Sequence, residues 1–141
     1  MITELSEKSA EKLLREQRVA HLGCVLDGGE PYVVPVNYIF EDRQIYIHTL
    51  PGQKIDALRA HPKACVQVEE IGKGCRWRSV IAFGEFQEIK RTNEKIKILQ
   101  EFNERFRHLT PVEATLEENP NAGGVVVFRV KVTRITGVAE S

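Results

Sequence analysis

Closely spaced turn signals between short apolar runs constrain the fold of this chain more than any other feature. The run at 19–26 is followed by Asp27-Gly28-Gly29, and the run at 32–40 is followed by an acidic turn at 41–43. Asp-Gly and Gly-Gly pairs accept the positive φ angles that tight hairpin turns require. Strands joined by so short a turn must run in opposite directions. We therefore expect consecutive antiparallel hairpins rather than a parallel sheet with crossover helices.

Six segments have the strand pattern, and three shorter or one-sided segments have the helical pattern. We expect helices at about 6–16, 52–61 and 92–106, and strands at 19–26, 32–40, 44–49, 64–71, 76–89 and 124–138. This predicts a mainly β protein: a six-stranded antiparallel barrel with helices on its outside, forming a single domain over residues 1–141.

Three residues mark special points in these elements. Pro35 cannot donate to a strand ladder, so its strand is expected at a sheet edge or a bulge. Gly84 is expected to bend a long strand. Thr92 is expected to cap the third helix. The segment 110–124, with two prolines and several acidic residues, is expected to be a loop.

The charge balance excludes several classes of partner. The chain has 141 residues with 20 basic and 20 acidic side chains, so its formal net charge is zero. General nucleic-acid binders and binders of anionic membranes have a basic excess instead. No apolar run reaches the roughly 18 residues of a membrane span, and the charged N-terminus is unlike a secretory signal.

Three cysteines without a CxxC pair predict no zinc site and fit the reducing cytoplasm.

The segment from His48 to Lys54 is the first candidate site. A strand ends there and a helix begins through Gly52. The first backbone N–H groups of a helix lack partners and suit a phosphate group. The Thr49 hydroxyl and the Lys54 ammonium would add a hydrogen bond and a charge. The alternative is a plain strand–turn–helix with a surface lysine.

Two further segments could contribute to a ligand site. In the first, strand alternation places Arg76 and Arg78 on one face and Trp77 and Ser79 on the other. The arginines suit a phosphate monoester, whereas the alternative is a solvated strand edge with Trp77 in the core. The second segment, 35–38, contains a proline-interrupted strand with free backbone groups that suit the edge of a heteroaromatic ring. Its alternative role is to keep an edge strand from aggregating.

The histidines give one candidate and no metal pattern. His48 lies beside the expected phosphate site, where it could contact a ligand, whereas His21, His61 and His108 fit surface or structural positions. Their spacing matches no metal-ligand motif, and the chain has no GxSxG or comparable nucleophile motif. No metal site and no catalytic side chain are predicted.

Four stretches together resemble a known family. They are PYVVPVNYIF (31–40), IYIHTLPGQKIDALRAHPKACVQV (45–68), RSVIAFGEF (78–86) and VVVFRVKVTRITG (125–137). In order and spacing they are similar to the FMN-binding split-barrel family of pyridoxamine 5'-phosphate oxidase relatives, and most similar to its nitroimidazole-reductase-like branch. The resemblance implies a six-stranded split barrel that forms a homodimer, with FMN in clefts at the subunit interface.

The resemblance also implies a set of cofactor-binding residues. One strand would run along the flavin ring and ribityl chain, a second would approach the ribityl phosphate, a helix start would meet the phosphate, and a third strand would reach the cofactor. In that order, these residues are Tyr32, Val33, Val34, Pro35, Val36 and Asn37; Ile47, His48 and Thr49; Gln53 and Lys54; and Ser79 with Arg78 beside it.

Three departures from the family pattern qualify the expected activity. Gln53 stands where many relatives have arginine, and Trp77 stands where tyrosine is frequent. The sequence stops soon after its last expected strand, without the segment that true pyridoxamine 5'-phosphate oxidases use to bind substrate. Pyridoxal phosphate synthesis is therefore not expected.

The expected function is that of an FMN-dependent oxidoreductase. It would reduce a small electron-poor substrate such as a nitroaromatic compound, with NADH or NADPH as the donor, and the flavin would supply the redox chemistry. The alternatives are a non-catalytic flavin carrier or haem-binding protein of the same fold, and a dimer whose cleft holds no cofactor.

Overall fold

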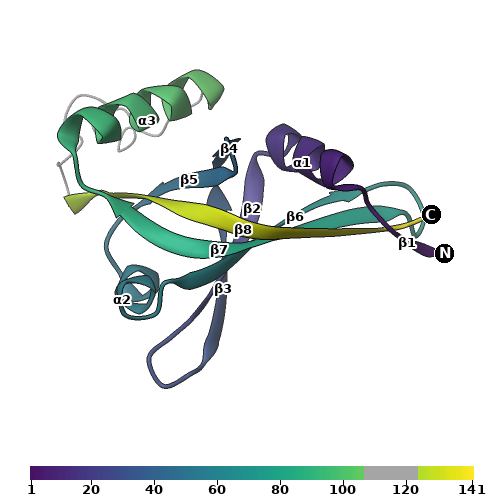
Figure 1. The fold of residues 1–141 in the computed structure, drawn as a ribbon, viewed down its shortest axis with the longest axis horizontal. Coiled ribbons are helices and arrows are strands. Elements are labelled where there is room, and N and C mark those ends of the chain that lie inside the picture. Colours follow the sequence, from purple (N-terminus) through teal and green to yellow (C-terminus); the bar gives the residue numbers. More distant parts are fainter. Residues whose placement is uncertain (107–123) are drawn as a thin grey trace.

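The computed structural model describes residues 1–106 and 124–141, which form one antiparallel sheet and three helices (Figure 1). The helices are α1 (Glu7–Glu16), α2 (Gln53–Ala60) and α3 (Thr92–Arg105). The strands are β1 (Ile2–Glu4), β2 (Val19–Val25), β3 (Pro31–Asn37), β4 (Ile39–Glu41), β5 (Gln44–Thr49), β6 (Lys63–Ile71), β7 (Trp77–Ile89) and β8 (Val126–Glu140). The sheet order is β3-β2-β6-β7-β8-β5-β4, and β1 also pairs with β8. The mainly β, antiparallel split-barrel prediction is confirmed.

The sheet curls so that the chain passes directly from one of its edge strands to the other. β3 and β4 stand at opposite ends of the strand order, yet only Tyr38 separates them in the sequence. The Tyr38 side chain is fully buried, and its hydroxyl donates to the backbone carbonyl of Leu14 in α1. Tyr38 therefore divides the segment expected as one strand at 32–40. Together with β1, this division gives eight strands in the described residues instead of six.

The turn and edge signals of the sequence are confirmed. Gly28 and Gly29 both have φ of 91° in the β2–β3 turn, and the Gly29 N–H donates to the Leu26 carbonyl over 2.9 Å. Pro35 lies in β3, which pairs only with β2 in the described residues. The β7–β8 register shifts between Phe83 and Gly84. A Cβ at Gly84 would lie 2.2 Å from the Lys131 carbonyl oxygen, so this close approach requires glycine.

The main hydrophobic core fills the inside of the curled sheet. Helices α1 and α2 close it from two sides, through Leu13 and Leu14 of α1 and Ile55 and Leu58 of α2. As expected, α1 begins at a Ser6 cap, whose hydroxyl oxygen accepts from the Ser9 N–H over 3.1 Å. Each fully buried leucine or isoleucine side chain contributes about 1.5–3 kcal/mol of burial free energy.

A second, smaller cluster lies under α3 on the other side of β5 and β8. Ile98, Leu99 and Phe102 of α3 pack there against β4, β7 and the start of β8. The end of α3 is fixed to the end of α1, because Arg105 Nη2 donates to the carbonyl oxygens of Arg15 and Gln17 over 2.6 and 2.9 Å. The expected cap at Thr92 is wrong: Arg91 occupies the N-cap position, Thr92 is the first helical residue, and no side chain caps this end.

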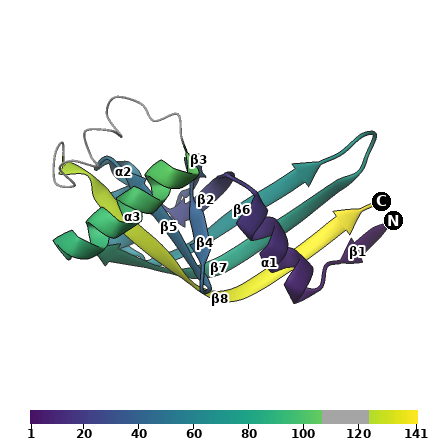
Figure 2. The ribbon, with the colours of Figure 1, turned by 90° about the horizontal axis from the view of Figure 1, so that it is seen from above.

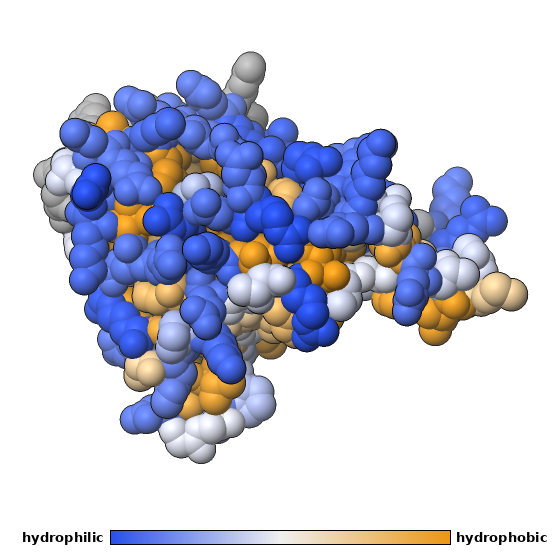
Figure 3. All heavy atoms as spheres, viewed as in Figure 1, coloured by the Kyte–Doolittle hydropathy of each residue, from blue (hydrophilic) through white to orange (hydrophobic). Residues whose placement is uncertain are grey.

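The far ends of β6, β7, β8 and β1 extend away from the body as an arm, which holds both chain ends (Figures 1 and 2). We define the arm as residues 1–4, 69–79 and 136–141. Figure 3 shows apolar surface on it, and Ile71 at the end of β6 is 71% exposed. No helix of the described residues has the length and apolar character to cross a membrane. The loop expected at 110–124 and His108 lie outside the described residues, apart from Gly124.

Candidate functional site

The strand register places several predicted site residues on one side of β3, β2, β6 and β7. Directly paired residues in an antiparallel sheet point to the same face. One row of paired residues therefore runs Val33–Gly23–Cys65–Phe83, and the next runs Pro35–His21–Gln67–Ile81. Ser79 pairs with Glu69 on the same side. We call this side of the four strands the outer face, because the residues between these rows point into the main core.

A chain of polar side chains crosses the outer face. His21 Nδ1 lies 2.9 Å from Gln67 Oε1, and Gln67 Nε2 donates to the Ser79 hydroxyl over 3.0 Å. Glu69 Oε1 lies 3.8 Å from the same His21 nitrogen. All three members of the chain are part-buried. Three strands therefore combine to hold Ser79, the residue that the sequence predicts to reach the cofactor.

A hollow of about 480 Å³ lies beside this polar chain. Its walls include Val33, Gly23, Cys65 and Phe83 of the first row. Gly23 leaves room for the Cys65 side chain, because a Cβ there would lie 2.8 Å from the Cys65 sulfur. The Arg134 guanidinium stacks over the Phe83 ring at 4.1 Å from its centroid. The hollow therefore has mostly apolar walls, and the cationic residue among those that line it is Lys63.

The start of α2 has the open end that the sequence predicts for a phosphate site. Gly52 is the N-cap and offers no side-chain acceptor. A Cβ at Gly52 would contact nothing within 4 Å, so the space beside this end is clear. Thr49 lies just before it, and its hydroxyl donates to the Leu50 carbonyl over 3.3 Å. The first N–H groups of α2 and their positive dipole end can therefore receive an anion.

The Lys54 ammonium lies within electrostatic range of Cys24 in β2. Burial raises the pKa of the Cys24 thiol in β2, the neighbouring Cys65 adds to this effect, and the Lys54 ammonium opposes it. That opposition places the Lys54 charge close to Cys24, which pairs with Tyr32 of β3. Within residues 1–106 and 124–141, Lys54 has no carboxylate partner. The Lys54 charge is therefore free to attract an anion, and its role at a phosphate stays a prediction.

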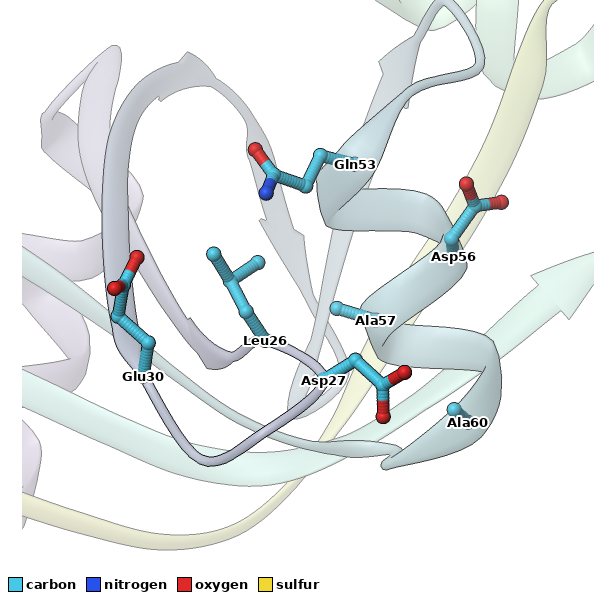
Figure 4. A pocket seen from close by; sticks show the side chains of 7 residues that line it. All are labelled: Leu26, Asp27, Glu30, Gln53, Asp56, Ala57 and Ala60. Carbon is cyan, nitrogen blue, oxygen red and sulfur yellow. The ribbon is translucent and has the colours of Figure 1, made fainter.

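Gln53 lies on a different side of α2. It lines a cavity of about 420 Å³ between α2 and the β2–β3 turn, and points toward that turn, where Leu26 and Glu30 lie (Figure 4). The other polar side chains of this cavity are the carboxylates of Asp27, Glu30 and Asp56. Three carboxylates repel a phosphate group. An anion at the start of α2 is thus better placed on the Lys54 side.

The remaining predicted site residues of β3 and β5 do not share one environment. Tyr32, Val34 and Val36 of β3 are half-buried and pack against the main core, whereas Asn37 is exposed. Ile47 is fully buried inside the core. His48 points to the opposite side of β5, where its ring meets Phe102 edge-on at 4.6 Å between centroids. The His48 side chain therefore lies against α3, away from the core face that Ile47 occupies.

The arginines of the arm lie far from α2. Arg78 Nη2 and Nε both donate to Glu70 Oε1, over 2.7 and 3.1 Å. Arg76 lies in the β6–β7 turn at the end of the arm, and Figures 1 and 2 place α2 on the body away from that end. One chain alone therefore does not bring Arg76 and Arg78 to Lys54. Trp77, the alternative core residue, is only half-buried on the arm.

Sequence reasoning missed His21 and Gln67 as parts of the site. The sequence alone indicates a surface or structural role for His21, and it predicts no role for Gln67, although Gln67 lies in the stretch 45–68 that resembles the family. They meet Ser79 only through the register of three strands: His21 and Gln67 are 46 positions apart in the sequence, and Gln67 and Ser79 are 12 positions apart. A prediction of strand alternation alone cannot give that register. No group of three or more metal-ligating side chains occurs in the part of the chain that the structure describes.

Comparison with known proteins gives a family match over nearly the whole chain. A family model described as pyridoxamine 5'-phosphate oxidase matches residues 6–139. An FAD-binding protein from Mesorhizobium loti has a similar structure with a TM-score of 0.77 and 29% sequence identity, covering 100% of this chain and 99% of that one.

Two more distant structures share the fold. A protein from Bacteroides thetaiotaomicron named for 5-nitroimidazole antibiotic resistance has a TM-score of 0.80 at 22% identity, covering 99% of this chain and 87% of that one. The haem storage protein of Vibrio cholerae has a TM-score of 0.74 at 14% identity, covering 92% of each chain. At these identities the likeness extends to the fold alone.

Proposed function

The chain belongs to the pyridoxamine 5'-phosphate oxidase family, and from that premise we propose that it is a flavin-dependent oxidoreductase. The family match confirms the resemblance that the sequence stretches predict. We propose FMN as the flavin, held in a cleft that a second copy of the chain completes. The FAD-binding protein from Mesorhizobium loti, similar over the whole chain, supports a flavin in general.

The observation that carries this proposal is the pairing of Lys54 with the open start of α2. Gly52 leaves the first N–H groups of α2 without a side-chain cap, and Lys54 directs its charge to the β2 and β3 side. A phosphate group there would accept backbone hydrogen bonds and one charge-assisted bond. Thr49, at the end of β5, is near enough in sequence to add its hydroxyl. These groups fit the phosphate of FMN.

The edge strand β3 suits the rest of such a cofactor. In the described residues β3 pairs on one side only, so backbone N–H and C=O groups on its other side are available, although Pro31 and Pro35 have no N–H to donate. The ring and ribityl chain of a flavin present both acceptors and donors. Tyr32 to Asn37 of β3 and Ser79 of the outer face would bind these groups. Gln53, Ile47 and His48 remain sequence-based predictions for the site.

A second copy of the chain would cover the outer face. Among the described residues seven large apolar side chains are exposed, and four of them lie on this face: Val19, Val25, Val33 and Ile71. The exposed fraction of Val33 is 67%. An apolar face of this kind is typical of a protein interface. A homodimer built on it would enclose the cofactor cleft and bring one arm to the other subunit.

When bound, FMN would supply two-electron chemistry, taking a hydride from NADH or NADPH and passing the electron pair to a small nitroaromatic-like compound. The protein would bind the phosphate, orient the ring and limit access of water. The fold shared with the 5-nitroimidazole resistance protein supports this class of substrate as the first to test.

The proposal can be tested with the purified chain. We expect it to bind FMN more tightly than riboflavin, because only FMN offers a phosphate to Lys54 and α2. Fluorescence titration with FMN, FAD and riboflavin measures these affinities. Anaerobic mixing of the FMN complex with NADH or NADPH should then bleach the flavin absorbance, and a nitroimidazole should restore it. No binding of FMN or FAD at micromolar concentration would exclude the proposal.

A second candidate is a binding protein without turnover, for flavin or haem. The haem storage protein of Vibrio cholerae, which has the same fold, supports the haem form. Haem needs an axial ligand such as histidine. The absorbance spectrum of the protein as purified distinguishes a haem Soret band from flavin bands. Flavin that stays oxidised with both nicotinamides and is still tightly bound would favour a carrier.

A further inference from the structure

The polar chain on the outer face has a defined direction. Gln67 presents its carbonyl oxygen to His21 and its amide N–H group to Ser79. A carbonyl oxygen only accepts, so His21 must donate from Nδ1. The Glu69 carboxylate, 3.8 Å from the same nitrogen, also favours a proton there. Each group in the chain therefore donates toward Ser79.

This order leaves one proton of the chain without an acceptor. A serine hydroxyl has one proton to donate and lone pairs that accept. Ser79 accepts from Gln67, and in residues 1–106 and 124–141 no group takes its proton. Ser79 is only half-exposed, so an acceptor from a ligand would replace water there. A ligand bound there would extend from Ser79 across the outer face toward the apolar hollow.

We propose that His21 and Gln67 are positioning residues that hold the Ser79 hydroxyl as a hydrogen-bond donor to an acceptor atom at the edge of a bound flavin ring. The identity of the ligand rests on the proposed function, whereas the order of the hydrogen bonds rests on the geometry of this chain. The donor at Ser79 selects a ligand that has an acceptor atom at its edge. A ring with only N–H groups at that edge is disfavoured, because it would leave the Ser79 proton without an acceptor.

The variant Gln67→Glu tests the direction of the chain at almost unchanged shape. A carboxylate has no N–H group, so Ser79 would donate to residue 67 and lose its donor role toward the ligand. We expect Gln67→Glu and Ser79→Ala each to raise the FMN dissociation constant by roughly three- to tenfold, the scale of one hydrogen bond. The double variant should bind FMN as tightly as the single variant with the lower affinity, because both changes remove the same hydrogen bond.

Gln87→Glu provides the matched control. Gln87 is an exposed residue of β7 whose amide oxygen accepts from Arg129, outside the polar chain. This variant adds the same negative charge to β7, the neighbour of the strand that holds Gln67, and its FMN affinity should stay within about twofold of the unchanged protein. The absorbance maximum of bound flavin should shift in the Gln67→Glu and Ser79→Ala complexes but not in the Gln87→Glu complex.

A measurement without cofactor decides the hydrogen-bond order by itself. Nitrogen NMR of the flavin-free protein should show His21 protonated at Nδ1 at a pH where the ring is neutral, and Gln67→Leu should remove this preference. A ring protonated at Nε2 would overturn the inference. The inference is also overturned if the protein binds FMN and the Gln67→Glu and Ser79→Ala variants leave FMN affinity and flavin absorbance unchanged. The same holds if these two variants weaken only the dimer. Failure of the unchanged protein to bind FMN would exclude the proposed function together with the ligand assignment.

Discussion

At the scale of single residues, Lys54 carries the largest part of the proposed phosphate site. Lys54→Ala should weaken FMN binding by about 1.5–3 kcal/mol, the scale of a hydrogen bond to a charged group. Riboflavin binding should change little, because riboflavin has no phosphate. Calorimetric titration with both ligands measures the difference. Lys8→Ala, at an exposed position of α1, is the control. Equal loss of FMN and riboflavin affinity would place Lys54 elsewhere in the site.

Tyr38 is the residue that joins the two edges of the sheet. Tyr38→Phe keeps the ring and removes the donor to the buried Leu14 carbonyl, so the free energy of unfolding should fall by about 1–3 kcal/mol. Tyr46→Phe, which removes a bond to the part-buried Gln44 side chain, should cost less. Urea unfolding of both variants checks the ranking. Equal stability of the two variants would contradict it.

The same tyrosine gives an alkaline pH dependence. Burial raises the pKa of the Tyr38 hydroxyl well above its ordinary value of about 10. Above that ordinary value the unfolded chain releases this proton while the folded chain keeps it, so stability falls as pH rises. Unfolding at increasing alkaline pH should therefore show a smaller loss of stability in Tyr38→Phe than in the unchanged protein.

At the scale of elements, the bend of β7 depends on Gly84. A Cβ there would lie 2.2 Å from the Lys131 oxygen and 2.9 Å from Val130 Cγ1. Gly84→Ala must separate β7 from β8, so we expect a loss of stability of about 1–3 kcal/mol or more. Gly72→Ala, whose Cβ would meet Arg76 at an ordinary 3.6 Å, should be tolerated. Thermal unfolding of the two variants tests this contrast.

The sequence predicts those features of these elements that depend on residues close together in the chain. The turn at Asp27, the Ser6 cap and the edge position of Pro35 each follow from a few neighbouring residues, and the structure has all three. The strand break at Tyr38 follows instead from a contact with Leu14 in a different element. The missing cap at Thr92 shows that a suitable residue type does not fix where a helix begins.

The candidate site divides in the same way. The open start of α2 and its lysine follow from the local segment 48–54 and were predicted. The polar chain at Ser79 depends on the register of β2, β6 and β7, which forms only when distant segments pair. The resemblance to a family implies a cofactor contact for Ser79. It implies no role for His21 or Gln67, the residues that hold Ser79 in place.

At the scale of the whole molecule, the outer face predicts association. A charge at its most exposed valine should oppose burial against a second copy, so Val33→Asp should convert a dimer to monomers and lower FMN affinity with it. Lys12→Asp, at a position of α1 where the side chain is 71% exposed, should keep the dimer. Sedimentation and light scattering at micromolar concentration measure both. A monomeric unchanged protein with full FMN occupancy would exclude the interface cleft.

The central place of β8 has a consequence for biosynthesis. This strand pairs with β1, β5 and β7, and so joins the amino-terminal segment to both clusters. While residues 126–140 are still within the ribosome, β5 and β7 have no shared neighbour and the apolar side chains of both clusters stay exposed. Pairings between such distant segments also form slowly. A nascent chain arrested before residue 126 should therefore be digested readily by protease, and one that displays β8 outside the tunnel should resist.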